Sequence, residues 1–364
     1  MDTPSQPLKF TPSLREKIWG GRRLGRMYRA PDPDRLYGEA WLIDDRVAAA
    51  DGPLAGQQLR DIAGAAPADV LGSRNVTEEL SAFPLLIKFL DAEDVLSVQV
   101  HPDDAYARRY EGQPFGKCEV WYVLEAEPGA RIIHGFKAPL TKEDLRRVIA
   151  EGRLVEAMQE VEVRPGDVVM NTPGTVHALG KGMLIYELQQ SSDLTYRLYD
   201  WDRQSEGAPR PLHIEPSIAV ADLAPFTQHK TQPVVLAEAG VTRTVFAACR
   251  YFAAEMLSIP GAAHSPQATT GATFHVLTAL SGQGTITCGA GAVTTLSAGE
   301  SALVPANLGP YRVEARSDPF VVIKAYVPDL MDDIVRPLRA YGISGEQIAQ
   351  LGGDARRSDL RSLV

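Results

Sequence analysis

The chain has 364 residues, and its 37 Lys and Arg against 46 Asp and Glu give a formal net charge of −9. Hydrophobic (45%) and charged (23%) fractions of ordinary size exclude a disordered, collagenous or coiled-coil protein. The negative charge disfavours nucleic acid as a partner, and no apolar run reaches the ~18–20 residues of a membrane span. Three widely spaced cysteines and the absence of a signal-peptide pattern predict a cytoplasmic protein without disulfides.

The first 200 residues indicate short strands interrupted by helices. Residues 1–50 are expected to be irregular apart from a strand at 38–43, and residues 54–80 to form two short helices. Helical spacing at 140–161, where Thr141 can cap the helix, separates two groups of strands. The expected strands lie in PLLIKFLDA, LSVQVHP, VWYVLEA, RIIHGF, VEVRPGDVVMNTPGTVHAL, MLIYELQQ and LTYRLYDW.

The chain after about residue 225 reads as a second β-rich block. Its short apolar runs are separated by Gly, Pro, Ser and Asn, a pattern typical of a sandwich or small barrel. An echo between 164–175 and 297–308 suggests two copies of one double-sheet unit. We therefore predict a mainly β protein with two β-sandwich or jelly-roll units, short helical insets and a helical tail. The predicted domains are residues 1–225, 226–328 and 329–364.

Four residues have the types and spacing of a metal site. Gln99 and His101 are two apart on a predicted strand and so share one face, with Val98 and Val100 on the other. Glu119 stands at the head of another strand, and His177 follows a Pro-Gly turn. Two imidazoles, a carboxylate and an amide oxygen suit a divalent cation, although each residue alone has an ordinary reading as a core or solvated side chain.

The joint order of these residues resembles the metal pattern of the cupin superfamily. More specifically, SVQVHPDD, GKCEVWYVLEAEPGA, PGTVHALGKG and ELQQSSDLTYRLYDWDR resemble the phosphomannose isomerase (mannose-6-phosphate isomerase) family of the short bacterial type. The resemblance runs from about Leu8 to about Tyr326 and includes KIWGG and FPLLIKFLDA. It implies two cupin barrels, the first of which binds one zinc ion through Gln99, His101, Glu119 and His177.

The same resemblance implies a metal-dependent aldose–ketose isomerase that interconverts mannose 6-phosphate and fructose 6-phosphate through an enediol. A redox-inert Lewis acid suffices for this reaction, together with a base that returns the proton. The partner is then a small sugar phosphate, with no membrane or nucleic acid involved, and the protein is expected to be a monomer or homodimer.

Cationic and acidic residues near the expected metal supply the candidates for catalysis. Arg197 resembles the catalytic arginine of the family, Lys117 shares a face with Glu119 by alternation, and Glu187 could shuttle the proton or open the sugar ring. The sequence does not decide which group is the base. Candidate substrate-binding residues are Ser97, Lys88 and Trp19.

Two other functions fit parts of the pattern. Two His and one Glu also suit the iron site of a cupin dioxygenase, and a cupin scaffold could serve a non-catalytic sugar-binding protein. The sequence Gly116-Lys117 lacks the following Ser or Thr of a phosphate-binding loop, so a nucleotidyltransferase is not supported. The second β block has no Q-x-H or H-x-H and is expected to be metal-free.

Overall fold

The computed structural model describes residues 4–76, 82–205, 207–289 and 291–364. The chain divides into two compact units, each built from separate stretches of sequence. Unit 1 consists of residues 1–13, 41–87 and 232–364, and unit 2 of residues 14–40 and 88–231. No helix in the described part of the chain is long and apolar enough to cross a membrane.

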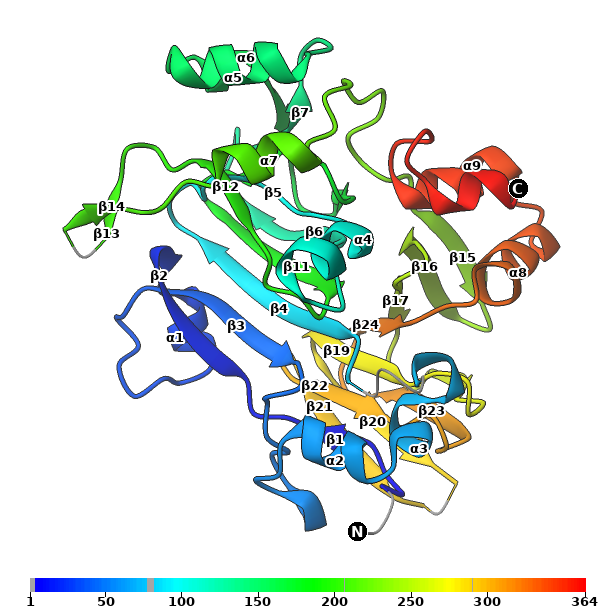
Figure 1. The fold of residues 1–364 in the computed structure, drawn as a ribbon. Coiled ribbons are helices and arrows are strands. Elements are labelled where there is room, and N and C mark those ends of the chain that lie inside the picture. The colour runs from blue at the N-terminus through cyan, green and yellow to red at the C-terminus, as the bar shows by residue number, and fades with distance from the viewer. Residues whose placement is uncertain (1–3, 77–81, 206, 290) are drawn as a thin grey trace. The chain divides into compact units, whose positions relative to one another are not determined.

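Two antiparallel sheets are built mainly from residues of unit 2 (Figure 1). The six-stranded sheet has the order β2 (Ser13–Gly21), β3 (Tyr37–Ile43), β4 (Leu85–Ala92), β11 (Met183–Gln190), β6 (Glu119–Ala126) and β9 (Val168–Asn171). The five-stranded sheet has the order β12 (Tyr196–Tyr199), β5 (Val98–Val100), β10 (His177–Leu179), β7 (Arg131–Phe136) and β8 (Met158–Glu162). A small hairpin pairs β13 (Gln204–Ser205) with β14 (Ala208–Pro209).

Alternation along these strands sorts the apolar side chains of unit 2 into two layers. A cluster that includes Trp121, Ile132 and Leu179 draws residues from both sheets. A second cluster, which includes Val98 and Leu145, fills the space between the five-stranded sheet and helices α5 (Lys142–Ala150), α6 (Leu154–Ala157) and α7 (Ile214–Val220). The other short helices are α1 (Arg23–Met27), α4 (Asp104–Tyr106) and the π-helix η3 (Ala107–Glu111).

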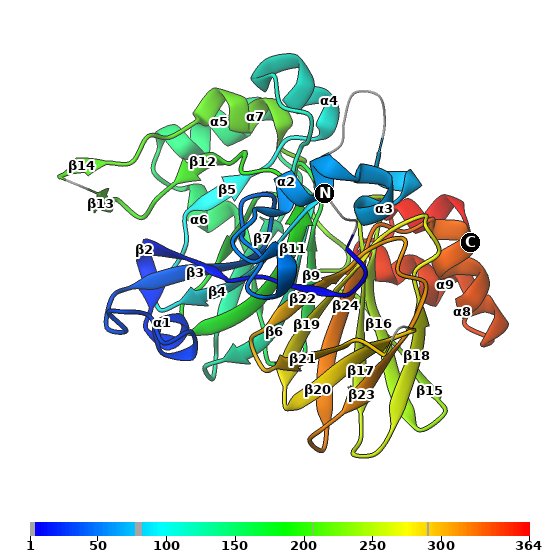
Figure 2. The same ribbon diagram turned by 90° about the horizontal axis from the view of Figure 1, so that it is seen from below.

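Unit 1 contains a second pair of antiparallel sheets, drawn mostly in yellow and orange in Figure 2. The seven-stranded sheet has the order β1 (Leu8–Lys9), β22 (Ser301–Val304), β19 (His275–Ser281), β24 (Phe320–Tyr326), β17 (Ala253–Ile259), β16 (Val241–Ala248) and β15 (Val234–Glu238). The four-stranded sheet has the order β18 (His264–Ala268), β23 (Pro310–Ala315), β20 (Gln283–Cys288) and β21 (Val293–Ser297). Alternate residues of both sheets, among them Leu257, Leu277 and Val313, form the core between them.

Short helices complete unit 1 at two places. The first group is η1 (Gly52–Leu54), α2 (Leu59–Ala65), α3 (Pro67–Leu71) and η2 (Ser73–Asn75). The tail forms the π-helix η4 (Leu330–Val335), α8 (Arg336–Ala340), α9 (Gly345–Ala349), η5 (Gln350–Gly352) and η6 (Asp359–Ser362). Ile334, Leu338 and Ile348 of this tail pack with Val234 and Val245 of the seven-stranded sheet.

The predicted fold class is confirmed, since both units are built from paired β-sheets and the tail is helical. Two local expectations were wrong. Residues 13–21 form β2, whose first half is largely exposed and therefore lacks the apolar signal of a buried strand. Residues 158–161, expected to be helical, belong to β8, because pairing with β7 outweighs the helix propensity of Met, Gln and Glu. Of the range 54–80, residues 77–80 lie outside the described part of the chain.

Candidate metal centre

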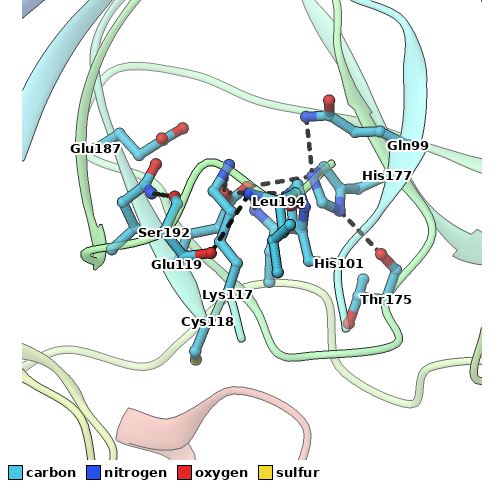
Figure 3. Close-up of polar contacts among 12 residues, drawn as sticks. Gln99, His101, Lys117, Cys118, Glu119, Thr175, His177, Glu187, Ser192 and Leu194 are labelled. Atoms are coloured by element: carbon cyan, nitrogen blue, oxygen red, sulfur yellow. Dashed lines mark hydrogen bonds and ion pairs between the residues drawn. The ribbon is translucent and has the colours of Figure 1, made fainter. Parts of the chain in front are cut away.

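Three buried side chains converge in unit 2 from different strands. His101 directly follows β5, Glu119 begins β6 and His177 begins β10. One donor atom from each side chain lies within 4.8 Å of the others, and the three residues are at most 1% exposed (Figure 3). They form the one such group of His, Cys, Asp and Glu among the described residues.

A backbone carbonyl fixes the tautomer of each histidine. The Nδ1 atom of His101 lies 2.8 Å from the carbonyl oxygen of Leu194, and that of His177 lies 2.9 Å from the carbonyl oxygen of Thr175. Because a carbonyl can only accept a hydrogen bond, each Nδ1 carries the proton. In the neutral form of either ring the lone pair is then on Nε2, the atom that faces Glu119.

Burial and the charges around this group favour a neutral His101 beside an ionised Glu119. Burial, together with nearby Lys117, lowers the pKa of His101 to about 3. Burial opposes the charge of Glu119, but the neighbouring charges, Lys117 foremost, outweigh it and hold the pKa of Glu119 well below its usual range. The Lys117 ammonium lies 2.9 Å from Oε2 of Glu119.

The donor atoms fit a cation better than they fit one another. Nε2 of His177 lies 3.1 Å from Oε1 of Glu119, and Nε2 of His101 lies 3.4 Å from Oε2. With the tautomers given above, these contacts bring lone pairs together, and Nε2 of His101 forms no hydrogen bond with another described residue. A buried acceptor left unpaired costs about 1–3 kcal/mol, so the residues fit a divalent metal ion that takes these lone pairs.

Gln99 is placed to complete the donor set. Its Cα is paired with that of His177 across β5 and β10, so both side chains point to the same face. The amide nitrogen of Gln99 lies 3.3 Å from Nε2 of His177, and a half-turn of the amide presents its oxygen there instead. The four predicted metal ligands are thus brought together.

A second charged pair lies in the same unit. Glu187 is 3% exposed, with Oε1 2.9 Å from Nζ of Lys88 and with Oε2 accepting a hydrogen bond of 2.7 Å from Nε1 of Trp121. Burial and the neighbouring Glu119 raise the pKa of Glu187. Burial lowers and Glu187 raises the pKa of Lys88, with a net increase.

Two residues that bind Glu187 and Glu119 were not among the site residues predicted from the sequence. Trp121 holds Glu187, and Asn171 donates from Nδ2 to Oε1 of Glu119 over 3.3 Å. Trp121 is two residues after Glu119 on one strand, so alternation could have identified it. Asn171 gave no signal, since its pairing with Glu119 depends on the register of β6 and β9.

The remaining predicted residues lie at different places. Arg197 is paired with Gln99 across β12 and β5, and its Nη1 atom donates to the carbonyl of Pro211 over 3.0 Å. Ser97 is buried just before β5. Trp19 is 4% exposed and packs in the apolar cluster of unit 2 that also contains Trp121.

The corresponding interior of unit 1 contains an ion cluster. Glu255 is fully buried, and its two oxygens are 2.7 and 3.0 Å from nitrogens of Arg243. Nζ of Lys324 lies 3.2 Å from Oε2, and Tyr326 donates to Oε1 over 2.6 Å. Positive side chains thus surround the carboxylate of Glu255.

Paired antiparallel sheets around a His, Glu, His and Gln donor set define a cupin with a metal centre. The profile of phosphomannose isomerase type I, catalytic domain, matches residues 8–120, and that of the mannose-6-phosphate isomerase cupin domain matches residues 242–323. Mannose-6-phosphate isomerase from Streptococcus mutans is 39% identical over 290 residues, which cover 78% of this chain and 88% of the relative. The chain therefore belongs to the mannose-6-phosphate isomerase family.

Solved structures agree with this assignment. The crystal structure of mannose 6-phosphate isomerase from Bacillus subtilis matches with a TM-score of 0.77 and 30% identity, covering 88% of this chain and 99% of that one. A zinc-bound mannose 6-phosphate isomerase matches in fold with a TM-score of 0.71 and 17% identity, covering 88% and 99% of the two chains. These relatives support the predicted isomerase rather than a dioxygenase or a sugar-binding cupin.

Proposed function

We propose that this chain is a zinc-dependent isomerase that interconverts mannose 6-phosphate and fructose 6-phosphate. The observation that carries the proposal is the buried His101, Glu119 and His177 group, with the Lys117 ammonium 2.9 Å from Glu119. Its relatives are named mannose-6-phosphate isomerases, and one solved relative has zinc bound. We infer one zinc ion per chain, held by these three residues and Gln99.

The donor set suits zinc because it combines two imidazole nitrogens with carboxylate and amide oxygens. When bound, zinc supplies a redox-inert Lewis acid that polarises the sugar oxygens at C1 and C2. The protein must then move a proton between C2 and C1, which requires a group able to take the proton and return it.

Glu187 is our candidate for that proton transfer. Burial and Glu119 raise the pKa of Glu187, which suits a carboxylate that takes up a proton and returns it. Lys88 and Trp121 hold its two oxygens at 2.9 and 2.7 Å, so its orientation is restrained. Opening of the sugar ring is an alternative role for the same carboxylate.

Lys117 and Arg197 supply the positive charge that an enediolate and a phosphate need. The Lys117 side chain is 5% exposed beside Glu119, and the Arg197 guanidinium shares a face with Gln99. We propose that Ser97 and Lys88 bind substrate oxygens. The substrate-binding role of Trp19 stays a prediction, with its indole ring packed in the core.

The same proposal assigns the two units. We propose that unit 2 carries the chemistry and that the cupin-like sheets of unit 1 are metal-free. The domain boundaries at 225 and 328 stay a prediction. Three buried cysteines without a disulfide agree with a cytoplasmic location, and we expect a monomer or homodimer.

A coupled assay for conversion of mannose 6-phosphate to fructose 6-phosphate tests this function. We expect activity to fall when zinc is removed by a chelator and to return when zinc is added. Glucose 6-phosphate in the same assay measures the strictness of the aldose preference. An enzyme with a full complement of zinc and no turnover of any aldose phosphate would contradict the proposal.

A further inference from the structure

The short segment that carries Lys117 and Glu119 is held from outside the donor group. β6 begins only at Glu119, so Gly116, Lys117 and Cys118 precede the strand. The side chains of Gln190 and Asp104 bind the peptide groups on both sides of Lys117, and we call this pair the brace. We propose that the brace is a positioning device for Lys117 in the isomerase reaction, an inference that rests on the proposed function.

Gln190 extends the strand pairing by means of its side chain. The ladder between β11 and β6 ends at the pair Gln189 and Glu119. Beyond it, the backbone amide of Gln190 donates to the carbonyl of Cys118 over 3.1 Å, and the backbone amide of Cys118 donates to Oε1 of Gln190 over 2.9 Å. The side-chain amide thus takes the place of a further strand residue, and Gln190 is only 2% exposed.

Asp104 closes the brace on the other side of Lys117. Its Oδ1 atom accepts a hydrogen bond of 3.0 Å from Nε2 of Gln190 and another of 2.8 Å from the backbone amide of Gly116. The backbone amide of Lys117 itself donates to the carbonyl of Pro102 over 2.9 Å. Three consecutive peptide groups are therefore fixed, at 116, 117 and 118.

The backbone of Pro102 and Asp103 packs closely against Gly116, which leaves the segment little room to move. A Cβ added at Gly116 would lie 2.4 Å from the carbonyl carbon of Asp103 and from the carbonyl oxygen of Pro102. These residues directly follow His101, so the brace ties the chain around one metal ligand to the chain that enters another. The brace itself contacts neither donor atom.

This arrangement predicts which step fails when the brace is lost. A displacement of a catalytic side chain by about 1 Å costs up to about 100-fold in rate. We therefore expect Gln190→Met and Asp104→Ala each to lower kcat by about 10- to 100-fold. The zinc content should change little, because the ligands remain, and the loss in kcat should exceed any change in the KM for mannose 6-phosphate.

Two matched variants separate positioning from general stability. Asp104→Asn keeps the Oδ1 acceptor for Gly116 and Gln190 and should restore most of the lost kcat. Asp103→Ala removes the side chain that caps α4 through the amide of Tyr106 but leaves the brace intact, so kcat should stay at the wild-type level. The double variant of Gln190 and Asp104 should be no slower than the slower single variant, because both changes remove one device.

Amide hydrogen exchange provides a readout that does not depend on activity. The amides of Gly116 and Cys118 should lose protection in Gln190→Met and Asp104→Ala and keep it in Asp103→Ala. Unchanged kcat in Gln190→Met, or an equal loss in Asp104→Ala and Asp103→Ala, would overturn the brace alone. A zinc-loaded wild-type enzyme without isomerase activity would instead overturn the proposed function, and this inference with it.

Discussion

Each histidine of the donor group is oriented by one backbone carbonyl, from Leu194 or Thr175. This hydrogen bond places the proton on Nδ1 and leaves Nε2 available for a metal. The orientation therefore depends on the course of the loops around residues 175 and 194. A histidine pattern in the sequence contains no information about such carbonyls.

At this scale we predict that His101→Ala and Glu119→Ala lose zinc. Each variant removes one of three clustered donors, and Glu119 also carries the negative charge that compensates the charge of the cation. Elemental analysis after dialysis should find almost no zinc in either variant. His264→Ala, at an exposed position in unit 1, is the control and should retain zinc. Retention of a full equivalent by Glu119→Ala would contradict the ligand assignment.

Arg197→Ala should separate chemistry from metal binding. The guanidinium faces the side of Gln99 but forms its hydrogen bond with Pro211, so zinc should remain bound. We expect kcat to fall by about 100-fold or more, as when one donor to a developing negative charge is removed. Steady-state kinetics and zinc analysis on the same preparation check this. The exposed Arg146, which pairs with Glu215 on helix α7, offers the control Arg146→Ala.

The convergence of Gln99, His101 and His177 could be predicted because alternation and turns determine where these side chains point. The contacts of Glu187 with Lys88 and Trp121 could not, because they depend on how several strands are aligned. The role of Trp19 could not be predicted either, for a different reason. An aromatic residue in an N-terminal segment suits either a substrate contact or the core, and the sequence does not distinguish them.

At the scale of the elements, the sequence of helix α5 contains a capping signal and an apolar face that the structure also shows. Thr141 accepts a hydrogen bond of 3.0 Å from the amide of Asp144, and Asp144 accepts one of 3.0 Å from the amide of Thr141. This capping box fixes the start of the helix, and Leu145 anchors it in the core.

We predict that Thr141→Ala lowers the free energy of unfolding by about 1 kcal/mol. The substitution leaves an amide at the helix start without its partner, while Leu145 stays buried. Urea unfolding of the zinc-loaded protein provides the measurement. Thr141→Ser retains the hydroxyl and should be close to wild type. Equal stability of the Ala and Ser variants would show that the box contributes nothing measurable.

The errors at element scale have one cause. β2 and β8 lie at sheet edges, where half of the side chains are exposed and the apolar pattern is weak. Their pairing with β3 and β7 comes from tertiary structure rather than from local propensity. The central strands β4 and β11 are buried throughout and could be recognised from sequence alone.

For the whole molecule, a buried histidine predicts how stability depends on pH. Burial lowers the pKa of His275 to about 3 in the folded protein, whereas the same side chain in the unfolded chain has a pKa of about 6.5. The unfolded state therefore binds a proton first as the pH falls below about 6.5, and stability decreases by up to about 1.4 kcal/mol per pH unit. Unfolding experiments from pH 7 to pH 5 should show this decrease.

His275→Asn provides the comparison. The variant loses the 2.7 Å contact between Nδ1 and the Tyr311 hydroxyl, so it should be less stable at pH 7. Its stability should also change less between pH 7 and pH 5, because the titrating ring is gone. The pKa of Glu255 is held below its usual range, as its ion pairs outweigh burial, so its effect appears only at lower pH. Parallel curves for the two proteins would contradict the prediction.

The discontinuous make-up of the two units also has a consequence for biosynthesis. The chain passes from one unit to the other after residues 13, 40, 87 and 231, and three of these passages fall inside the strands β2, β3 and β4. Unit 2 can be complete once residue 231 has left the ribosome, whereas unit 1 waits for β15 to β24 and the tail. The proposed metal ligands are therefore all synthesised before β15 to β24, the strands with which residues 41–87 form unit 1.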